Sequence, residues 1–144
     1  MSSLRKGRAS GAAKATRPMP AAIAKAHQRY LLIALCMPGA ELSTSYGTPA
    51  IKVRGKLMSR WRNEAEGALA IRCDFLDRQI LLLTQPDVFF LTDHYRDYPM
   101  VLIHLQKASK AVLTDAVERA WRLVAPAGLI RERDRSPARG KRSP

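Results

Sequence analysis

Residues 46–62 read YGTPAIKVRGKLMSRWR, and this stretch decides the fold that the sequence predicts. Apolar and basic side chains alternate over 50–53 and return over 57–62, as they do in strands with one buried and one wet face. A glycine between two basic residues, at 54–56, is the expected turn. The stretch therefore predicts a β-hairpin whose exposed face is basic.

The predicted hairpin carries five basic residues and no acidic residue, and these are Lys52, Arg54, Lys56, Arg60 and Arg62. If the turn has three residues, Lys52, Arg60 and Arg62 share one face of the sheet, with the other two at the tip. If the turn has two residues, the register slips and the basic face breaks up, because side chains alternate between faces. Such a hairpin can contact phosphates, while Tyr46 and Trp61 stack on exposed bases. The alternative is a solvated charged face with Trp61 in the core.

Helical and strand patterns follow on both sides of the hairpin. Helices are predicted from about Pro20 to before Pro38, over 75–84, and, capped by Ser109, over 110–124. Strands are predicted at 68–73, 88–91 and 100–105, and a polar loop at 41–49. The segment 75–84 fits a strand as well, and the helix is favoured. The predicted order is α-β(3)-α-β(2)-α. It indicates an α+β fold with helices packed on one face of a mostly antiparallel sheet.

The positive charge of the chain lies mainly near its ends. The chain has 144 residues, which suggests one domain, and a net charge of +13. Residues 1–18 contribute +5 and residues 131–144 contribute +4. Both are rich in polar and charged residues and have no apolar face, so they are predicted to be disordered basic tails around a domain at 19–130. Basic tails favour any polyanion as a partner.

Membrane, metal and cofactor chemistry find no signal in the sequence. No apolar run approaches the roughly 20 residues that a membrane helix needs, and no secretory signal is evident. Cys36 and Cys73 lack the spacing of a metal motif and are expected to be reduced core thiols. The three histidines are scattered, and no phosphate-binding glycine motif occurs. We therefore expect a cytoplasmic monomer without metal or cofactor.

A second group of polar and aromatic residues occurs in the segment 93–99, which reads DHYRDYP. His94, Tyr95, Arg96 and Tyr98 form a candidate recognition loop, because imidazole, phenol and guanidinium groups together can bind an anion. The alternative is an ordinary exposed hairpin loop with packed rings at its base. No positioned catalytic partner is evident in the sequence, so we do not expect an enzyme.

Four sequence blocks, in this order between about Ala22 and Leu129, resemble the MmcQ/YjbR family: YGTPAIKVRGKLMSRW, LAIRCD, PDVFFLTDHYRDYPMVLIHL and AWRLVAP. The resemblance implies a small α+β fold similar to that of type III secretion chaperones. It also implies a DNA-binding protein of the kind described as double-wing. The family often has glycine where this chain has Asp97, and the aspartate places a carboxylate beside Arg96.

The function expected from residues and resemblance together is DNA binding. The basic hairpin and the basic tails would contact the phosphate backbone, with weak or no sequence specificity. The alternative is a protein-interaction module or a small-anion-binding module. An exposed apolar patch would favour the first alternative, and a deep pocket containing His94 and Arg96 would favour the second.

Overall fold

The computed structural model describes residues 20–63 and 67–135. The predicted tail 1–18, the centre of the turn predicted at 63–67, and residues 136–144 of the other predicted tail lie outside the described residues. Within the described ranges, no helix is long and apolar enough to cross a membrane.

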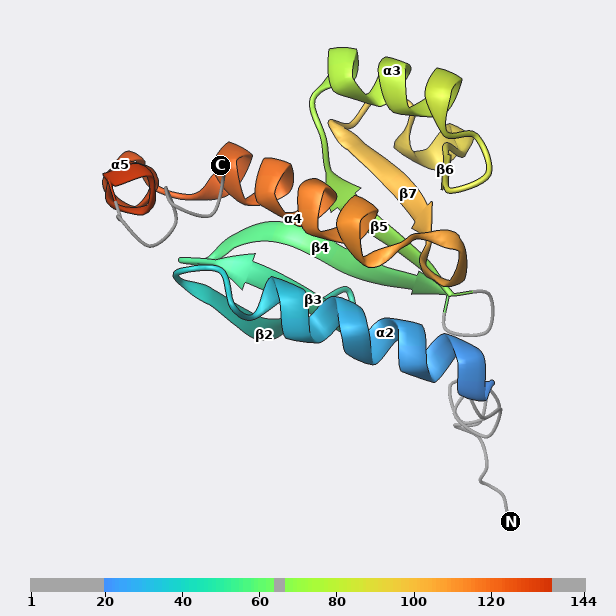
Figure 1. The fold of residues 1–144 in the computed structure, drawn as a ribbon, viewed down its shortest axis with the longest axis horizontal. Helices are drawn as coiled ribbons and strands as arrows, with labels where there is room; N and C mark the ends of the chain where they lie inside the picture. Colours follow the sequence, from blue (N-terminus) through green and yellow to red (C-terminus); the bar gives the residue numbers. More distant parts are fainter. Residues whose placement is uncertain (1–19, 64–66, 136–144) are drawn as a thin grey trace.

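Six antiparallel strands form one open sheet (Figure 1). In chain order they are β2 (Ala40–Ser45), β3 (Thr48–Val53), β4 (Lys56–Asn63), β5 (Ala68–Arg72), β6 (Phe89–Phe90) and β7 (Met100–His104). Their order across the sheet is β2-β3-β4-β5-β7-β6, so the last two strands exchange places. The α+β class and the antiparallel sheet are as predicted.

Four α-helices and two 3₁₀ turns complete the described fold: α2 (Ala21–Ala34), α3 (Phe75–Thr84), η1 (Asp93–Tyr95), η2 (Leu105–Lys107), α4 (Lys110–Val124) and α5 (Ala127–Arg135). Short polar side chains begin two of them. Asp74 accepts a hydrogen bond from the Asp77 amide at 2.8 Å, and Ser109 accepts one from the Val112 amide at 3.1 Å. Helices 75–84 and 110–124 therefore begin and end where the sequence predicts.

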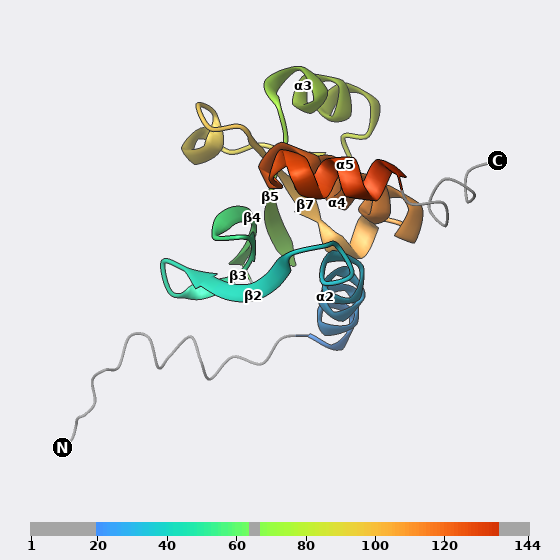
Figure 2. The ribbon, with the colours of Figure 1, turned by 90° about the vertical axis from the view of Figure 1, so that its left-hand side faces the viewer.

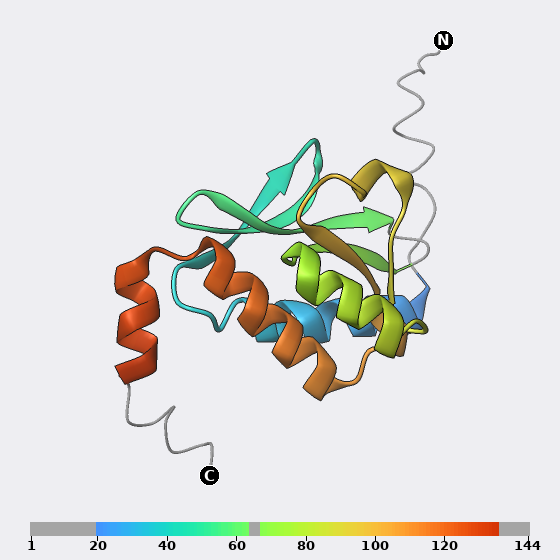
Figure 3. The same cartoon turned by 90° about the horizontal axis from the view of Figure 1, so that it is seen from above.

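The main hydrophobic core lies between one face of the sheet and the helices α2 and α4. Leu69 and Ile71 of β5 point into this core together with the fully buried Trp121 of α4. Residues between them along the strand point the other way, and Ala70 joins a smaller cluster with Tyr95 and two residues of β7. Figure 3 shows α2 and α4 on the side of the sheet away from the loop that carries η1. The sheet face opposite α2 and α4 is called the open face below.

Two parts of the predicted order are wrong. The segment 41–49, predicted as a polar loop, overlaps strand β2 (Ala40–Ser45), which pairs with β3 along its whole length. It lacks an apolar alternation because it is an edge strand without a fully buried residue. Residues 131–135, predicted to belong to a disordered tail, are the end of α5, whose Leu129 and Ile130 pack against the core. The order of the described elements is thus α-β(4)-α-β(2)-α-α.

The β3–β4 turn has two residues, and a bulge corrects its effect on the register. Val53 pairs with Lys56, so only Arg54 and Gly55 form the turn. The register then shifts by one residue, so that Ile51 pairs with Ser59 and Met58 is buried together with Ser59. The two-residue turn was expected to break up the basic face. The bulge prevents this, because after it Ala50 pairs with Arg60, which places the Arg60 side chain on the same face of the sheet as Lys52.

Candidate nucleic-acid interface

A hollow of about 430 Å³ on the open face brings the two predicted site segments together. Its lining comes from the end of β2 and the β2–β3 turn, from β4 and β5, and from the loop before β7 with the first residue of β7: Ser45, Tyr46, Leu57, Arg60, Arg62, Arg72, His94, Tyr95, Tyr98, Pro99 and Met100. In Figure 2 the β2–β3 turn and the loop between β6 and β7 extend toward the same side, away from α2. We call this site the arginine hollow.

Arg60 is fixed in place by four neighbours. Its Nε donates hydrogen bonds to the Ser45 carbonyl oxygen at 3.2 Å and to Thr48 Oγ1 at 3.0 Å. Its Nη1 donates to the Tyr95 hydroxyl at 3.1 Å. The guanidinium carbon also lies 5.2 Å from the centre of the Tyr46 ring, which is a cation–π contact. Arg60 therefore joins strand β4 and the β2–β3 hairpin to the loop that carries Tyr95.

Arg62 and Arg72 supply two further guanidinium groups from neighbouring strands. The β4–β5 register shifts between Trp61 and Asn63, so Arg62 is a bulge residue, and its guanidinium carbon lies 5.7 Å from the centre of the Tyr95 ring. Arg72 donates from Nε to the Leu57 carbonyl oxygen at 3.2 Å. Arg72 is the residue of this group that sequence reasoning missed, because it stands alone in an otherwise apolar strand.

No carboxylate of the described residues neutralises the arginine hollow. Within the described ranges, no aspartate or glutamate lines it, and Arg60, Arg62 and Arg72 form no ion pair. On α4 and α5 the opposite holds, because Arg119, Arg122 and Arg133 are all within 2.9 Å of a carboxylate oxygen. The open face therefore offers positive charge to a ligand, whereas the helical side has already paired much of its own.

The other predicted hairpin residues lie outside the arginine hollow. Lys52 is on the open face, but its β2 partner in the register is Glu41, a carboxylate directly across from it. Arg54 is exposed in the turn. Trp61 is buried and stacks on His27, with 4.2 Å between ring centres, so it lies in the core, as the alternative placed it, and cannot stack on a base. Tyr46 is exposed, as base stacking requires.

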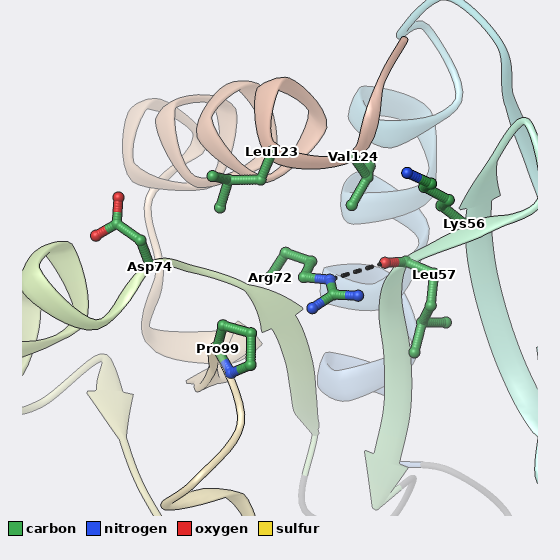
Figure 4. A pocket seen from close by; sticks show the side chains of 7 residues that line it. All are labelled: Lys56, Leu57, Arg72, Asp74, Pro99, Leu123 and Val124. Carbon is green, nitrogen blue, oxygen red and sulfur yellow. Dashed lines mark hydrogen bonds between the residues drawn. The ribbon is translucent and has the colours of Figure 1, made fainter.

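Lys56 lies at a second hollow of about 410 Å³, beside the end of α4 (Figure 4). Its lining is mixed, with Lys56 and Asp74 at opposite ends and apolar side chains of α4 between them. Arg72 lines this hollow as well as the first, and its hydrogen bond to the Leu57 carbonyl oxygen lies at the boundary of both. The carboxylate of Asp74 makes this second hollow less suited to a polyanion than the arginine hollow.

The predicted recognition loop is divided by the fold. His94, Tyr95 and Tyr98 line the arginine hollow, where the His94 ring meets the Tyr95 ring edge-on at 4.7 Å. Arg96 does not line it, because its Nη2 pairs with the Asp93 carboxylate at 3.4 Å, exposed to solvent. A pocket containing both His94 and Arg96 was the sign expected of a small-anion site, and the hollow contains only the first.

Arg78 holds the loop in place, and no signal in the sequence marked it. It is 9% exposed, and its two terminal nitrogens donate to four backbone carbonyls, those of Tyr95, Arg96, Tyr98 and Met100, at 2.8–3.2 Å. The guanidinium also lies over the Phe75 ring at 4.8 Å. The position of Tyr95 and Tyr98 in the arginine hollow therefore depends on a buried cation in α3.

The titratable and metal-binding groups elsewhere add no second site. Burial, and then the charges of Asp77 and Asp74, raise the pKa of the Cys73 thiol to about 11, so it stays protonated at neutral pH. Among the residues that the structure describes, no group of three histidine, cysteine or acidic side chains could hold a metal ion.

No family model matches the chain, and a search of curated proteins found no match either.

Proposed function

We propose that the protein binds DNA through the phosphate backbone, with weak or no sequence specificity, at the arginine hollow. The observation that carries the proposal is the convergence of Arg60, Arg62 and Arg72 on the open face without an ion pair among the described residues. Guanidinium groups bind phosphates through paired N–H donors. The basic tails proposed from the sequence would add contacts that are independent of this site.

The resemblance to the MmcQ/YjbR family supports the same proposal, since it implies DNA binding. The proposed contact surface is narrower than the hairpin predicted from the sequence, because Lys52 faces Glu41 and Lys56 faces the second hollow. We propose a binding role rather than a catalytic one. His94 contacts the rings of Tyr95 and Tyr98, and neither ring can orient an imidazole as a base in the way a carboxylate does. The proposed setting is a monomer in the cytoplasm.

Binding of the full chain to a short labelled DNA duplex, measured at several salt concentrations, tests this proposal. Two phosphate contacts in the arginine hollow, those of Arg62 and Arg72, give a log–log salt slope of about −1.8 on a duplex, to which the tails add. Arg62→Glu is the decisive variant, because Arg62 makes no hydrogen bond or ion pair among the described residues and its replacement should leave the fold intact. We expect the variant to bind DNA about tenfold more weakly and to lower the slope by about 1.

Arg131→Glu is the matched control, since Arg131 is exposed on α5 and the charge change is the same. It should weaken binding much less than Arg62→Glu. Equal effects of the two variants would mean that total charge, and not the arginine hollow, determines binding. No binding of the unmodified chain at low salt, either to the duplex or to a single strand of the same length, would refute the proposed function itself.

A second candidate function is protein interaction, and an exposed apolar stripe on α3 favours it. Leu76, Ile80 and Leu83 follow one another at helical spacing and are 67%, 49% and 76% exposed. The charged side chains of the helix do not share this stripe, because Asp77 pairs with Arg119 and Arg78 is buried. Contiguous exposed apolar surface often marks an interaction site.

Sedimentation velocity over a range of protein concentrations tests whether the apolar stripe on α3 is a self-association surface. If α3 is a self-association surface, a dimer should form with rising concentration, and Leu83→Glu should abolish it. A monomer at every concentration would agree with the proposed oligomeric state and leave the stripe without a function in self-association. Neither result depends on whether the arginine hollow binds DNA.

A further inference from the structure

The arginine hollow is rimmed by aromatic rings that lie outside the hydrophobic core and are exposed to solvent. Tyr46 is 90% exposed and Tyr98 is 55% exposed, so neither side chain contributes much to the core. His94 is exposed on the same rim. Three rings beside three unpaired guanidinium groups are more than phosphate binding requires. Phosphate contacts alone need only positive charge and N–H donors.

The rings are held so that a flat ligand can reach them. Arg60 lies against one side of the Tyr46 ring, at 5.2 Å from its centre, and the exposure of the residue leaves its remaining surface to solvent. Tyr98 is fixed through its backbone, because its carbonyl oxygen accepts from Arg78 at 2.8 Å and its amide donates to the Tyr95 carbonyl oxygen at 3.1 Å. The side chain of Tyr98 therefore stands on an anchored loop while its ring stays accessible.

The dimensions of the hollow fit a nucleotide that is not paired in a duplex. Its volume of about 430 Å³ lies within the range of small-ligand pockets. Bases inside a duplex have both faces covered by their neighbours and present only their edges in the grooves. A single strand offers free base faces that stack on aromatic side chains while its phosphates meet basic residues. Rings and guanidinium groups at one hollow therefore match a single strand better than a duplex.

We propose that the arginine hollow binds single-stranded DNA, with one unpaired base stacked on each of Tyr46 and Tyr98 and the adjoining phosphate held by Arg62 and Arg72. This proposal rests on the proposed DNA-binding function and specifies the form of the DNA. The remaining guanidinium, that of Arg60, is already bound to Ser45, Thr48 and Tyr95, so it holds Tyr46 and the loop in position.

Fluorescence anisotropy with the full chain tests the form of DNA that is bound. The probes are a labelled oligothymidylate, a duplex of the same length, and an abasic strand of the same length and charge. We expect the oligothymidylate to bind most tightly. Tyr46→Ala and Tyr98→Ala should each weaken its binding by about 5-fold to 150-fold, the range that loss of one base–aromatic stack produces. The salt slope should not change, because neither variant alters the charge.

The matched controls are Tyr46→Phe and Tyr98→Phe, which keep the ring and should keep the affinity. Circular dichroism of the alanine variants checks that the fold is retained. Equal binding of the abasic strand, or alanine variants that bind the oligothymidylate normally, would overturn the single-strand proposal while leaving DNA binding intact. Thymidine monophosphate that competes at the same concentration as the strand would also overturn it, in favour of a free nucleotide. Failure of every probe to bind would refute the proposed function as well.

Discussion

The Tyr95 hydroxyl accepts a hydrogen bond from Arg60 Nη1 at 3.1 Å, and this bond joins strand β4 to the loop before β7. Tyr95 is only 4% exposed, so the bond lies where water competes weakly. The same arginine contacts Ser45 and Thr48 of the β2–β3 hairpin. One guanidinium therefore fixes the relative position of three segments that line the arginine hollow.

Replacement of Tyr95 by phenylalanine removes this bond and leaves the ring in place. We expect Tyr95→Phe to lower the free energy of unfolding by about 1 kcal/mol, the usual net contribution of one hydrogen bond. Urea denaturation followed by circular dichroism measures the difference. Tyr98→Phe is the control, because Tyr98 is exposed and its hydroxyl has no hydrogen bond among the described residues; it should change stability by less than about 0.5 kcal/mol. Equal stabilities of the two variants would contradict the structural role of the Tyr95 hydroxyl.

Arg78 is the residue on which the loop depends most. Arg78→Met retains the apolar part of the side chain but withdraws its donors from four carbonyl oxygens. We expect a loss of about 2–4 kcal/mol in the free energy of unfolding, since buried acceptors left without a partner are costly. Hydrogen exchange should also become faster at the amides of Tyr98 and Met100, which bond within the loop.

Arg96→Met provides the comparison for this prediction. Arg96 lies in the same loop, but its only ion pair among the described residues is the exposed one with Asp93. Its loss should cost at most about 0.5 kcal/mol, as expected of a surface ion pair. If Arg78→Met were as mild as Arg96→Met, the loop would be held by something other than the buried guanidinium.

The elements that the sequence predicted best are those with a strong apolar period. Apolar residues recur at helical spacing over 110–124, after a serine cap, and the described helix α4 has the same bounds. Strand β2 was missed because AELSTS, at an edge of the sheet, has no apolar alternation to detect. The turn length at 54–56 was undecided because a single glycine between two basic residues fits either turn. The bulge that follows depends on the packing of Met58 and Ser59, which no local pattern reveals.

The candidate site was only partly predictable for a related reason. The hairpin and the HYRDYP loop were each identified by residue type, but their meeting at one hollow depends on the sheet order, which places β7 beside β5. Arg78 contributes through backbone carbonyls that lie 17 to 22 residues further along the chain. Carbonyl acceptors are the same in every residue, so no sequence signal identifies them. Arg72 likewise becomes a site residue only through its position opposite Met100.

Glu118 links α4 to α5 and should make stability depend on acid pH. Arg133 Nη2 lies 2.6 Å from one of its carboxylate oxygens and Arg122 Nε lies 2.9 Å from the other. Partial burial acts to raise the pKa of Glu118, but the hydrogen bonds and charges of Arg133 and Arg122 outweigh it and hold the pKa below the usual range. A lowered folded-state pKa stabilises the fold above the unfolded pKa of about 4.3, and this stabilisation is lost as the pH falls through the folded pKa.

Urea unfolding at neutral pH and at a pH below 4 should therefore distinguish Glu118→Gln from the unmodified chain. At neutral pH we expect the variant to be less stable, by on the order of 1 kcal/mol. On acidification it should lose less stability than the unmodified chain, because it has no carboxylate there to protonate. Asp97→Asn, at an exposed residue with no ion pair among the described residues, should lose as much as the unmodified chain. Identical acid losses for all three proteins would refute the role of Glu118.

The β3–β4 turn gives a prediction that separates the tip of the hairpin from the arginine hollow. Arg54 and Gly55 both have positive φ angles, 48° and 88°, a two-residue turn in which Asn-Gly is strongly preferred. Arg54→Asn should therefore raise the free energy of unfolding by about 0.5 kcal/mol, since asparagine tolerates this conformation better than arginine. Gly55→Ala should lower it by about 1 kcal/mol for conformational reasons alone, because an added Cβ would meet nothing within 4 Å.

Arg54→Asn also removes one positive charge from the tip of this hairpin, outside the arginine hollow. Its affinity for DNA should fall less than that of Arg62→Glu. Because Arg54→Asn changes the charge by one unit and Arg62→Glu by two, Arg54→Glu is the variant with an equal change in charge, and it too should weaken binding less than Arg62→Glu. Anisotropy titrations of these variants at one salt concentration measure the difference, and urea unfolding confirms that each is folded. If Arg54→Glu weakened binding as much as Arg62→Glu, the turn rather than the hollow would be the contact surface, and the three guanidinium groups on the open face would need another ligand.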